Sequence, residues 1–179
     1  VLERVTQHAE HFSQVSKQIW DFAELGYQEQ KSSTLLQQEL KSAGFRIQTP
    51  VAGEPTGFIA EYGQGRPVIA ILAEFDALPS LSQAATPDRA PLAAEAPGHG
   101  GGHNLLGSGA ALAAVAVKEY LQANRVAGTL RVYGTPAEEG GGGKILMARQ
   151  GAFAGLDAAM MIHPADADER GIRSGVRKI

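Results

Sequence analysis

The 179-residue sequence contains no cysteine, so it can form neither a disulfide framework nor a thiolate zinc site, and this composition fits a reducing compartment. It also lacks any apolar run of about 18 residues, the length that a membrane-spanning helix requires. Basic residues are not in excess, and the formal net charge of −3 argues against nucleic acid or an anionic membrane as a partner. These absences predict a cytoplasmic protein. We expect a trimmed or truncated N-terminus, because the sequence begins with Val1.

The residues that are present suit one globular domain, with 44% hydrophobic and 20% charged residues. Apolar periodicity predicts helices, and short β-rich runs between glycine and proline signals predict strands. A long surface loop rich in Ala, Pro and Ser is expected over residues 80–97. The order of elements predicts an α/β fold with a mixed, mostly parallel sheet flanked by helices. The expected helices cover residues 1–25, 30–43, 103–124 and 145–150, and the expected strands cover residues 45–48, 57–62, 68–72, 129–133 and 157–162.

The segment 97–109, PGHGGGHNLLGSG, places two histidines in a run of glycines that leads into an apolar helix. Glycines allow the backbone to approach a ligand closely, and neutral histidine nitrogens bind transition metals. A single histidine at the start of a helix is most often structural, but a pair within a glycine run is unusual. We therefore take His103, on the first helical turn, and His99 as candidate metal ligands.

Further polar side chains follow three of the expected strands. Glu74 and Asp76 come after the third strand, Glu138 and Glu139 after the fourth, and His163 after the fifth. Ligand sites of open α/β sheets collect at the carboxyl ends of strands. Together with the helix start they give a His, Glu and His set, His103, Glu139 and His163, whose nitrogens and oxygen suit Zn²⁺, Mn²⁺ or Co²⁺, and these three residues are too far apart in sequence for a local zinc finger. The pattern therefore favours a catalytic metal site over a structural one.

Two other kinds of site lack their motifs. The glycine run before Lys144 does not fit a Walker A loop, because Glu138 stands where the first glycine is required and Ile145 replaces Ser or Thr. Neither glycine run reads G-x-G-x-x-G, and Ser108 is not in a G-x-S-x-G motif. Nucleotide binding and serine hydrolysis are therefore not supported.

Four motifs occur in an order that resembles the amidohydrolase branch of the M20 metallopeptidases, the aminoacylase/carboxypeptidase type: AEFDALP, GHGGGHNLLGSG, YGTPAEEGGGGK and the late IHP. The early segment WDFAELGYQEQKSS is also similar, so the resemblance covers nearly the whole chain. It implies a phosphorylase/hydrolase-like catalytic domain with a two-metal centre. The implied reaction is hydrolysis of the amide bond of N-acyl amino acids such as p-aminobenzoyl-glutamate.

Residue by residue, the resemblance implies that His103, Glu139 and His163 are metal ligands. Glu138 matches the general base, and Asp76 matches the acid that supports the site from the preceding strand end. The implied cofactor is one or two divalent ions, Zn²⁺ or Mn²⁺. The expected partner is a small acyl-amino acid substrate.

The chain departs from the branch in two ways. The branch reads G-H-x-C-G-H with cysteine as a ligand, whereas this chain has Gly101, so the two-metal centre is expected to be weakened unless His99, water or a substrate carboxylate takes that place. Residues 1–179 also correspond to only the N-terminal part of a catalytic domain, without the lid or dimerisation domain through which a homodimer or a related subunit would pair. The alternative is a degenerate, non-catalytic relative that binds a ligand or partners an active subunit.

Overall fold

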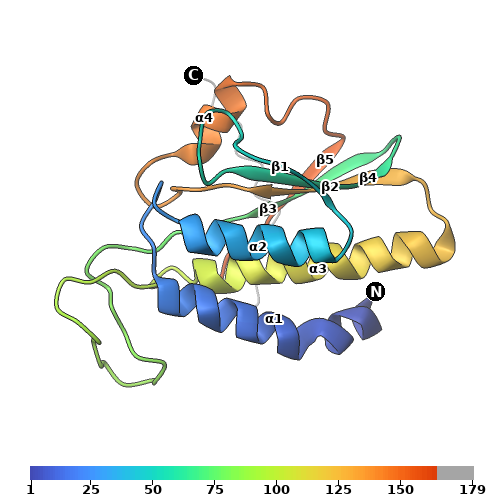
Figure 1. Ribbon diagram of the computed structural model, residues 1–179. Coiled ribbons are helices and arrows are strands. Elements are labelled where there is room, and N and C mark those ends of the chain that lie inside the picture. Colours follow the sequence, from blue (N-terminus) through green and yellow to red (C-terminus); the bar gives the residue numbers. More distant parts are fainter. Residues whose placement is uncertain (165–179) are drawn as a thin grey trace.

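The computed structural model describes residues 1–164 (Figure 1). The expected partial catalytic domain spans residues 1–179, and its part from residue 165 onward lies outside the described residues. Every predicted helix and strand is present, with bounds shifted by a few residues at most. None of the helices in the described part is both long and apolar enough to cross a membrane. The elements are α1 (Leu2–Phe22), α2 (Gln30–Ser42), β1 (Arg46–Gln48), β2 (Phe58–Gln64), β3 (Val68–Ala73), α3 (His103–Asn124), β4 (Gly128–Gly134), α4 (Gly143–Arg149) and β5 (Ala158–Met160).

The five strands form one sheet in the order β1-β2-β4-β3-β5. β3 pairs in parallel with β4 and β5, whereas β2 is antiparallel to both β1 and β4. The predicted mixed α/β architecture is confirmed, but the described pairings are evenly divided instead of mostly parallel. The reason is the short connection between β2 and β3, residues 65–67, because a parallel crossover needs a dozen or more residues and a short link can only reverse the chain.

Helices cover both faces of the sheet (Figure 1). α2 and α3 lie against one face with α1 packed outside them, and α4 lies on the other face. The main core lies under α2 and α3 and includes Phe58, Phe75, Leu36 and Leu40, all fully buried. Small residues on the buried side of α3 let this helix approach the sheet closely, and they are Gly107, Ala110, Ala111 and Ala114.

The segment 80–97 forms the predicted loop, with no helix or strand assigned. Its two ends are tied together, since Leu78 and Gly98 exchange backbone hydrogen bonds of 2.9 Å in both directions. The loop therefore returns to the carboxyl end of β3, where it leads into α3. This return brings the glycine–histidine segment beside the residues that follow β3.

Candidate metal centre

His103 lies at the centre of the polar cluster, on the first turn of α3, with 1% of its surface exposed. The helix can begin so close to β3 because residue 107 is glycine: a Cβ there would lie 2.7 Å from the Glu74 carbonyl oxygen. Glu74 and Asp76 continue the alternation of the strand and point to one side, whereas Phe75 between them stacks on Phe58. The two carboxylates therefore face the imidazole.

Asp76 fixes the orientation of His103. Its Oδ1 lies 2.9 Å from His103 Nδ1, and its Oδ2 accepts a 2.9 Å hydrogen bond from the Glu139 backbone N–H. Burial alone would raise the pKa of Asp76, but the hydrogen bonds from His103 and Glu139 outweigh it, and the pKa is lowered. An ionised Asp76 accepts the Nδ1 proton, so Nε2 is the nitrogen left for a ligand.

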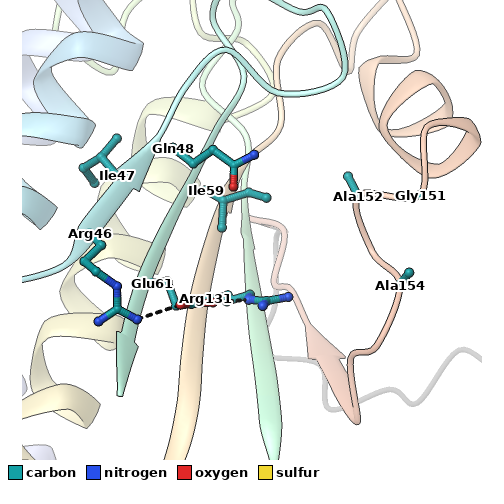
Figure 2. A pocket seen from close by; sticks show the side chains of 9 residues that line it. All are labelled: Arg46, Ile47, Gln48, Ile59, Glu61, Arg131, Gly151, Ala152 and Ala154. Atoms are coloured by element: carbon teal, nitrogen blue, oxygen red, sulfur yellow. Dashed lines mark hydrogen bonds and ion pairs between the residues drawn. The ribbon is translucent and has the colours of Figure 1, made fainter. Parts of the chain in front are cut away.

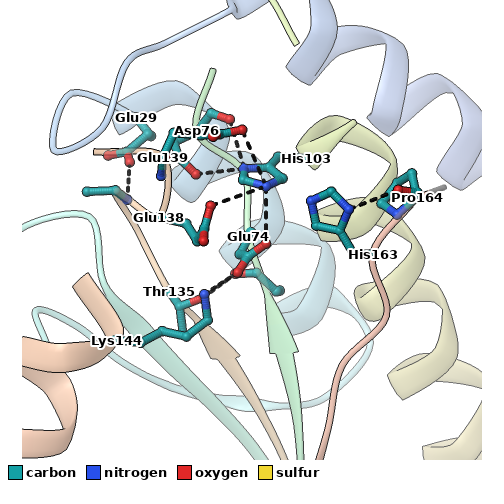
Figure 3. A network of polar contacts seen from close by, with 12 residues as sticks. Glu29, Glu74, Asp76, His103, Thr135, Glu138, Glu139, Lys144, His163 and Pro164 are labelled. Atoms are coloured by element: carbon teal, nitrogen blue, oxygen red, sulfur yellow. Dashed lines mark hydrogen bonds and ion pairs between the residues drawn. The ribbon is translucent and has the colours of Figure 1, made fainter. Parts of the chain in front are cut away.

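Three carboxylates surround that nitrogen (Figure 3). His103 Nε2 lies 3.2 Å from Glu74 Oε2 and 3.8 Å from both Glu138 Oε2 and Glu139 Oε1. The ring of His163 stands edge-on to that of His103, with 5.4 Å between ring centroids. We call these residues, together with Asp76, the His103 centre.

The donor atoms of the His103 centre fit a divalent metal. Within the described residues, ligand atoms meet within 4.8 Å in two groups, Glu74–His103–His163 and His103–Glu138–Glu139. His103 Nε2 and Glu74 Oε2 are both buried without a hydrogen-bond partner, which is uncommon for buried polar atoms. His163 Nδ1 lies 2.9 Å from the Pro164 carbonyl oxygen, so in both histidines one ring nitrogen is occupied by an oxygen acceptor, as in metal-bound histidines.

The charges of the centre also favour a cation. The pKa of His103 is raised: burial would lower it, but the hydrogen bond and charge of Asp76 and the charge of Glu74 outweigh burial. A metal ion would occupy the same electrostatic position as that proton. Lys144 Nζ contacts Glu74 Oε1, so its ammonium offsets part of the negative charge of the four carboxylates of the centre.

The loop after β4 places the paired glutamates. Ala137 adopts a left-handed conformation with φ of 54° and donates a 2.7 Å hydrogen bond from its N–H to the buried carboxylate of Glu29. From this turn Glu139, with a side chain 23% exposed, reaches inward, whereas Glu138 is 43% exposed and lies at the solvent side. Burial, opposed by His103 and assisted by Glu138, raises the pKa of Glu139. The two neighbouring side chains therefore occupy different environments.

Gly101 faces the centre directly. A Cβ at this position would lie 2.5 Å from Glu139 Oε1 and 3.8 Å from His103 Nε2. The absence of a side chain thus makes room for the Glu139 carboxylate. A residue larger than glycine at position 101 would require Glu139 to move.

His99 lies outside both groups of candidate ligands. It is 4% exposed, its Nε2 is 3.0 Å from the Ile19 carbonyl oxygen, and its ring lies 6.5 Å from that of Trp20. Burial lowers its pKa to about 4, so the ring is neutral. In this structure His99 connects the glycine run to α1 instead of joining the His103 centre.

Sequence reasoning placed Glu74 at the end of the third strand without giving it a role, and it did not single out Lys144 or Glu29, which the structure also places around the centre. Glu74 carried a detectable signal, since it is the first polar residue after the apolar run of β3. Lys144 follows the glycine run, but only the fold shows that it reaches back to Glu74. Glu29 lies near the start of α2, and nothing in the local sequence links it to Ala137.

A separate pocket of about 410 Å³ lies over β1, β2 and β4 (Figure 2). Arg46, Glu61 and Arg131 form one row across these strands, and Glu61 pairs with each arginine at 2.7 Å. The guanidinium groups are therefore already neutralised by a carboxylate. The residues around this pocket are not those of the His103 centre.

Comparison with known proteins agrees with the motifs. A p-aminobenzoyl-glutamate hydrolase subunit of Escherichia coli (strain K12) is 46% identical over 156 residues, which cover 87% of this chain and 32% of that protein. The Xaa-Arg dipeptidase of Mus musculus is 34% identical over 176 residues, covering 91% of this chain and 37% of that protein. This chain thus spans about a third of the length of these curated relatives.

The fold also matches solved structures. A Bacillus subtilis protein described as a dinuclear metal-binding peptidase of the M20 family superposes with a TM-score of 0.63 at 28% identity, over 83% of this chain and 41% of that one. Residues 70–176 match Peptidase family M20/M25/M40. That match covers more than half of the sequence and includes every residue of the His103 centre, so the chain belongs to peptidase family M20/M25/M40.

Proposed function

We propose that this chain carries the metal-binding centre of an amidohydrolase that cleaves the amide bond of N-acyl amino acids, with p-aminobenzoyl-glutamate as a representative substrate. The observation that carries the proposal is the convergence of three carboxylates on the buried, unpartnered Nε2 of His103. The substrate class follows from the 46% identity with the E. coli hydrolase.

His103, Glu139 and His163 are the residues we propose as ligands, for one or two ions of Zn²⁺ or Mn²⁺. When bound, such a metal polarises the scissile carbonyl and lowers the pKa of water toward neutrality. Asp76 is a positioning residue, because it holds the imidazole of His103 through Nδ1 and the Glu139 backbone through its N–H.

Glu138 is the residue we propose as general base. Its carboxylate lies beside the centre but is more exposed than that of Glu139, so it can reach a water molecule at the open side. It would take the proton from the attacking water and later deliver it to the nitrogen of the leaving amine. Adjacent glutamates can divide the roles of base and ligand because their side chains point in different directions.

A pocket of about 340 Å³ borders the centre and supports binding of a small substrate. Asp76 and Glu139 form its polar side, and Leu25, Tyr27 and Pro79 line it with apolar surface. This combination suits a ligand with an apolar or aromatic acyl group and a polar amide.

The proposal extends to the domain organisation of the protein and to its partner chains. We propose that residues 1–179 are part of a catalytic domain, since they span about a third of the relatives, and that a homodimer or a complex with a related subunit forms through other parts of the protein. The E. coli relative is named as one subunit of a hydrolase, which supports pairing of this kind. The cytoplasmic location stays a prediction from the sequence.

The direct test uses the protein expressed from its complete reading frame. After removal of metal with a chelator, we expect no release of p-aminobenzoate from p-aminobenzoyl-glutamate, and we expect release to return on addition of Zn²⁺ or Mn²⁺. Metal binding without hydrolysis of any N-acyl amino acid in a panel would instead support the non-catalytic alternative.

Gly101 is the observation that favours that alternative, and Gly101→Cys tests it. The new side chain adds a thiolate where the Cβ lies 3.8 Å from His103 Nε2, but it displaces Glu139 Oε1. If glycine is a lost ligand, metal affinity or stoichiometry rises in the variant. Unchanged metal binding would show that the centre is built without a ligand at position 101.

A further inference from the structure

The carboxylate of Glu74 belongs to the His103 centre but has no role in the proposed function. Its side chain is 3% exposed, and one oxygen, Oε2, is buried without a hydrogen-bond partner. The other oxygen contacts Lys144 Nζ. A buried carboxylate is normally paired, and here the ring nitrogens of His103 and His163 gather with a Glu74 oxygen within 4.8 Å.

The distance to His103 identifies what fits at Oε2. Two donors that bind one ion at about 2.1 Å in a tetrahedral arrangement are about 3.4 Å apart. Glu74 Oε2 and His103 Nε2 are 3.2 Å apart, and neither has a hydrogen-bond partner. Among the described carboxylates, Glu138 and Glu139 lie farther from the same nitrogen, each at 3.8 Å.

We propose that Glu74 is a metal ligand in this chain, completing a group with His103 and His163 that needs no side chain at position 101. This inference rests on the proposed function, since it assigns a further residue to the same centre. The Glu139 carboxylate fills the space beside Gly101, so the additional donor comes from the end of β3 instead. Lys144 holds the outer oxygen and directs Oε2 toward the histidines.

A different role for Glu74 makes a different prediction. Glu74 and Asp76 could simply accept an ion pair from a protonated His103, with the metal held elsewhere in the centre. In that case the loss of the Glu74 charge would still weaken the binding of a nearby cation, but the number of bound ions and the Co²⁺ spectrum would stay unchanged. The number of bound ions and the Co²⁺ spectrum are therefore the measurements that separate the two roles.

The experiment compares metal binding by the wild-type protein, from its complete reading frame, with that of Glu74→Gln. Each protein is stripped of metal and titrated with Zn²⁺, and Co²⁺ is used to record the ligand-field absorption spectrum. We expect Glu74→Gln to lower Zn²⁺ affinity at least tenfold, or to lose one ion, and to change the Co²⁺ spectrum. A tenfold loss is the lower end of what removal of an outer partner of a metal ligand costs, about 10-fold to 100-fold.

Three variants complete the design. Glu54→Gln makes the same change at a buried carboxylate outside the centre and should leave metal binding unchanged. Glu74→Gln/Lys144→Met removes the ammonium left without its carboxylate and should bind Zn²⁺ more weakly than Lys144→Met alone. If Glu74→Gln does not fold, Glu74→Asp keeps the charge but shortens the reach, and it should also weaken Zn²⁺ binding and alter the Co²⁺ spectrum.

The possible results separate the two proposals. Equal stoichiometry and an equal Co²⁺ spectrum in wild type and the folded Glu74 variant, whatever the affinity, would overturn the role of Glu74 and leave the proposed function intact. A wild-type protein that binds neither Zn²⁺, Mn²⁺ nor Co²⁺ would overturn the proposed function itself.

Discussion

Two groups of buried carboxylates contact the loop 135–143, and they differ in their partners. In the His103 centre, Asp76 accepts hydrogen bonds from His103 and Glu139, and its pKa is lowered. The second group, which we call the Glu29 pair, consists of Glu29 and Glu54. Glu29 accepts from the Ala137 N–H and the Thr56 hydroxyl, whereas both oxygens of Glu54 are buried without a partner.

The difference lies in the presence of positive charge. Lys144 and His103 offset the carboxylates of the His103 centre, but the Glu29 pair has no basic side chain among the described contacts, and its pKa values rise. Burial, together with the charge of Glu29, raises the pKa of Glu54 to about 7. Burial also raises the pKa of Glu29 despite its hydrogen bonds. The first group is therefore suited to bind a cation, and the second supports the loop with a carboxyl group that retains its proton.

The largest expected effect tests whether catalysis depends on the His103 centre and not on the Glu29 pair. Glu138→Gln should reduce kcat on p-aminobenzoyl-glutamate by about 10²–10⁴, because a general base contributes about that factor. Metal content, measured by elemental analysis, should stay unchanged. Glu54→Gln is the matched control and should keep wild-type kcat. A similar loss in both variants would contradict the separation of the two groups.

The next effect concerns stability and its dependence on pH. In the folded protein Glu54 keeps its proton up to pH of about 7, whereas the unfolded chain releases it above about 4.5, so this group lowers the free energy of unfolding as the pH rises between these values. Glu54→Gln should therefore raise the free energy of unfolding by about 3 kcal/mol at pH 8 and by little at pH 4.5. Urea unfolding of both proteins at the two pH values measures this. Tyr27 is the other titratable group beside Glu54 that this comparison must consider. Burial and the charges of Glu54 and Glu29 raise its pKa, so it stays protonated at pH 8. An equal gain at both pH values would show that the effect is not electrostatic.

A smaller effect is expected where a carboxylate orients a ligand. Asp76→Asn can still contact His103 Nδ1, but it no longer holds the Nδ1–H tautomer by charge. We expect Zn²⁺ affinity to fall about 10-fold to 100-fold, as for other partners of metal-bound histidines. Competition with a chromogenic chelator gives the affinity. A variant that binds Zn²⁺ as tightly as wild type would show that Asp76 does not determine the orientation of His103.

The smallest effect concerns a surface contact of the same loop. Tyr27 donates a 2.9 Å hydrogen bond from its hydroxyl to the Gly141 carbonyl oxygen, at a position open to water. Tyr27→Phe should lower the free energy of unfolding by about 0.5–1 kcal/mol, since water can replace the lost partner. Chemical unfolding at neutral pH measures the change. A loss of several kcal/mol would indicate that the loop depends on this contact more than on Glu29.

Most of the fold could be predicted from local patterns. The helix over residues 103–124 has the predicted bounds, and the strand expected over residues 68–72 is present as β3. The neighbours of each strand could not be predicted, because β4 inserts between β2 and β3 although more than 50 residues separate it from β3 in the sequence. Local periodicity contains no information about which strand becomes a neighbour.

The sequence by itself determined the order of helices and strands, the polar residues that follow β3, β4 and β5, and the motifs of the M20 family. Only the tertiary structure decided which of these side chains meet. It placed Glu74 nearest to His103 Nε2, turned His99 toward Ile19, and filled the space at Gly101 with the carboxylate of Glu139. The physical reason is that strand ends and residue spacing bring side chains to one edge of a sheet, whereas the direction of each side chain depends on loop conformation and on neighbours distant in sequence.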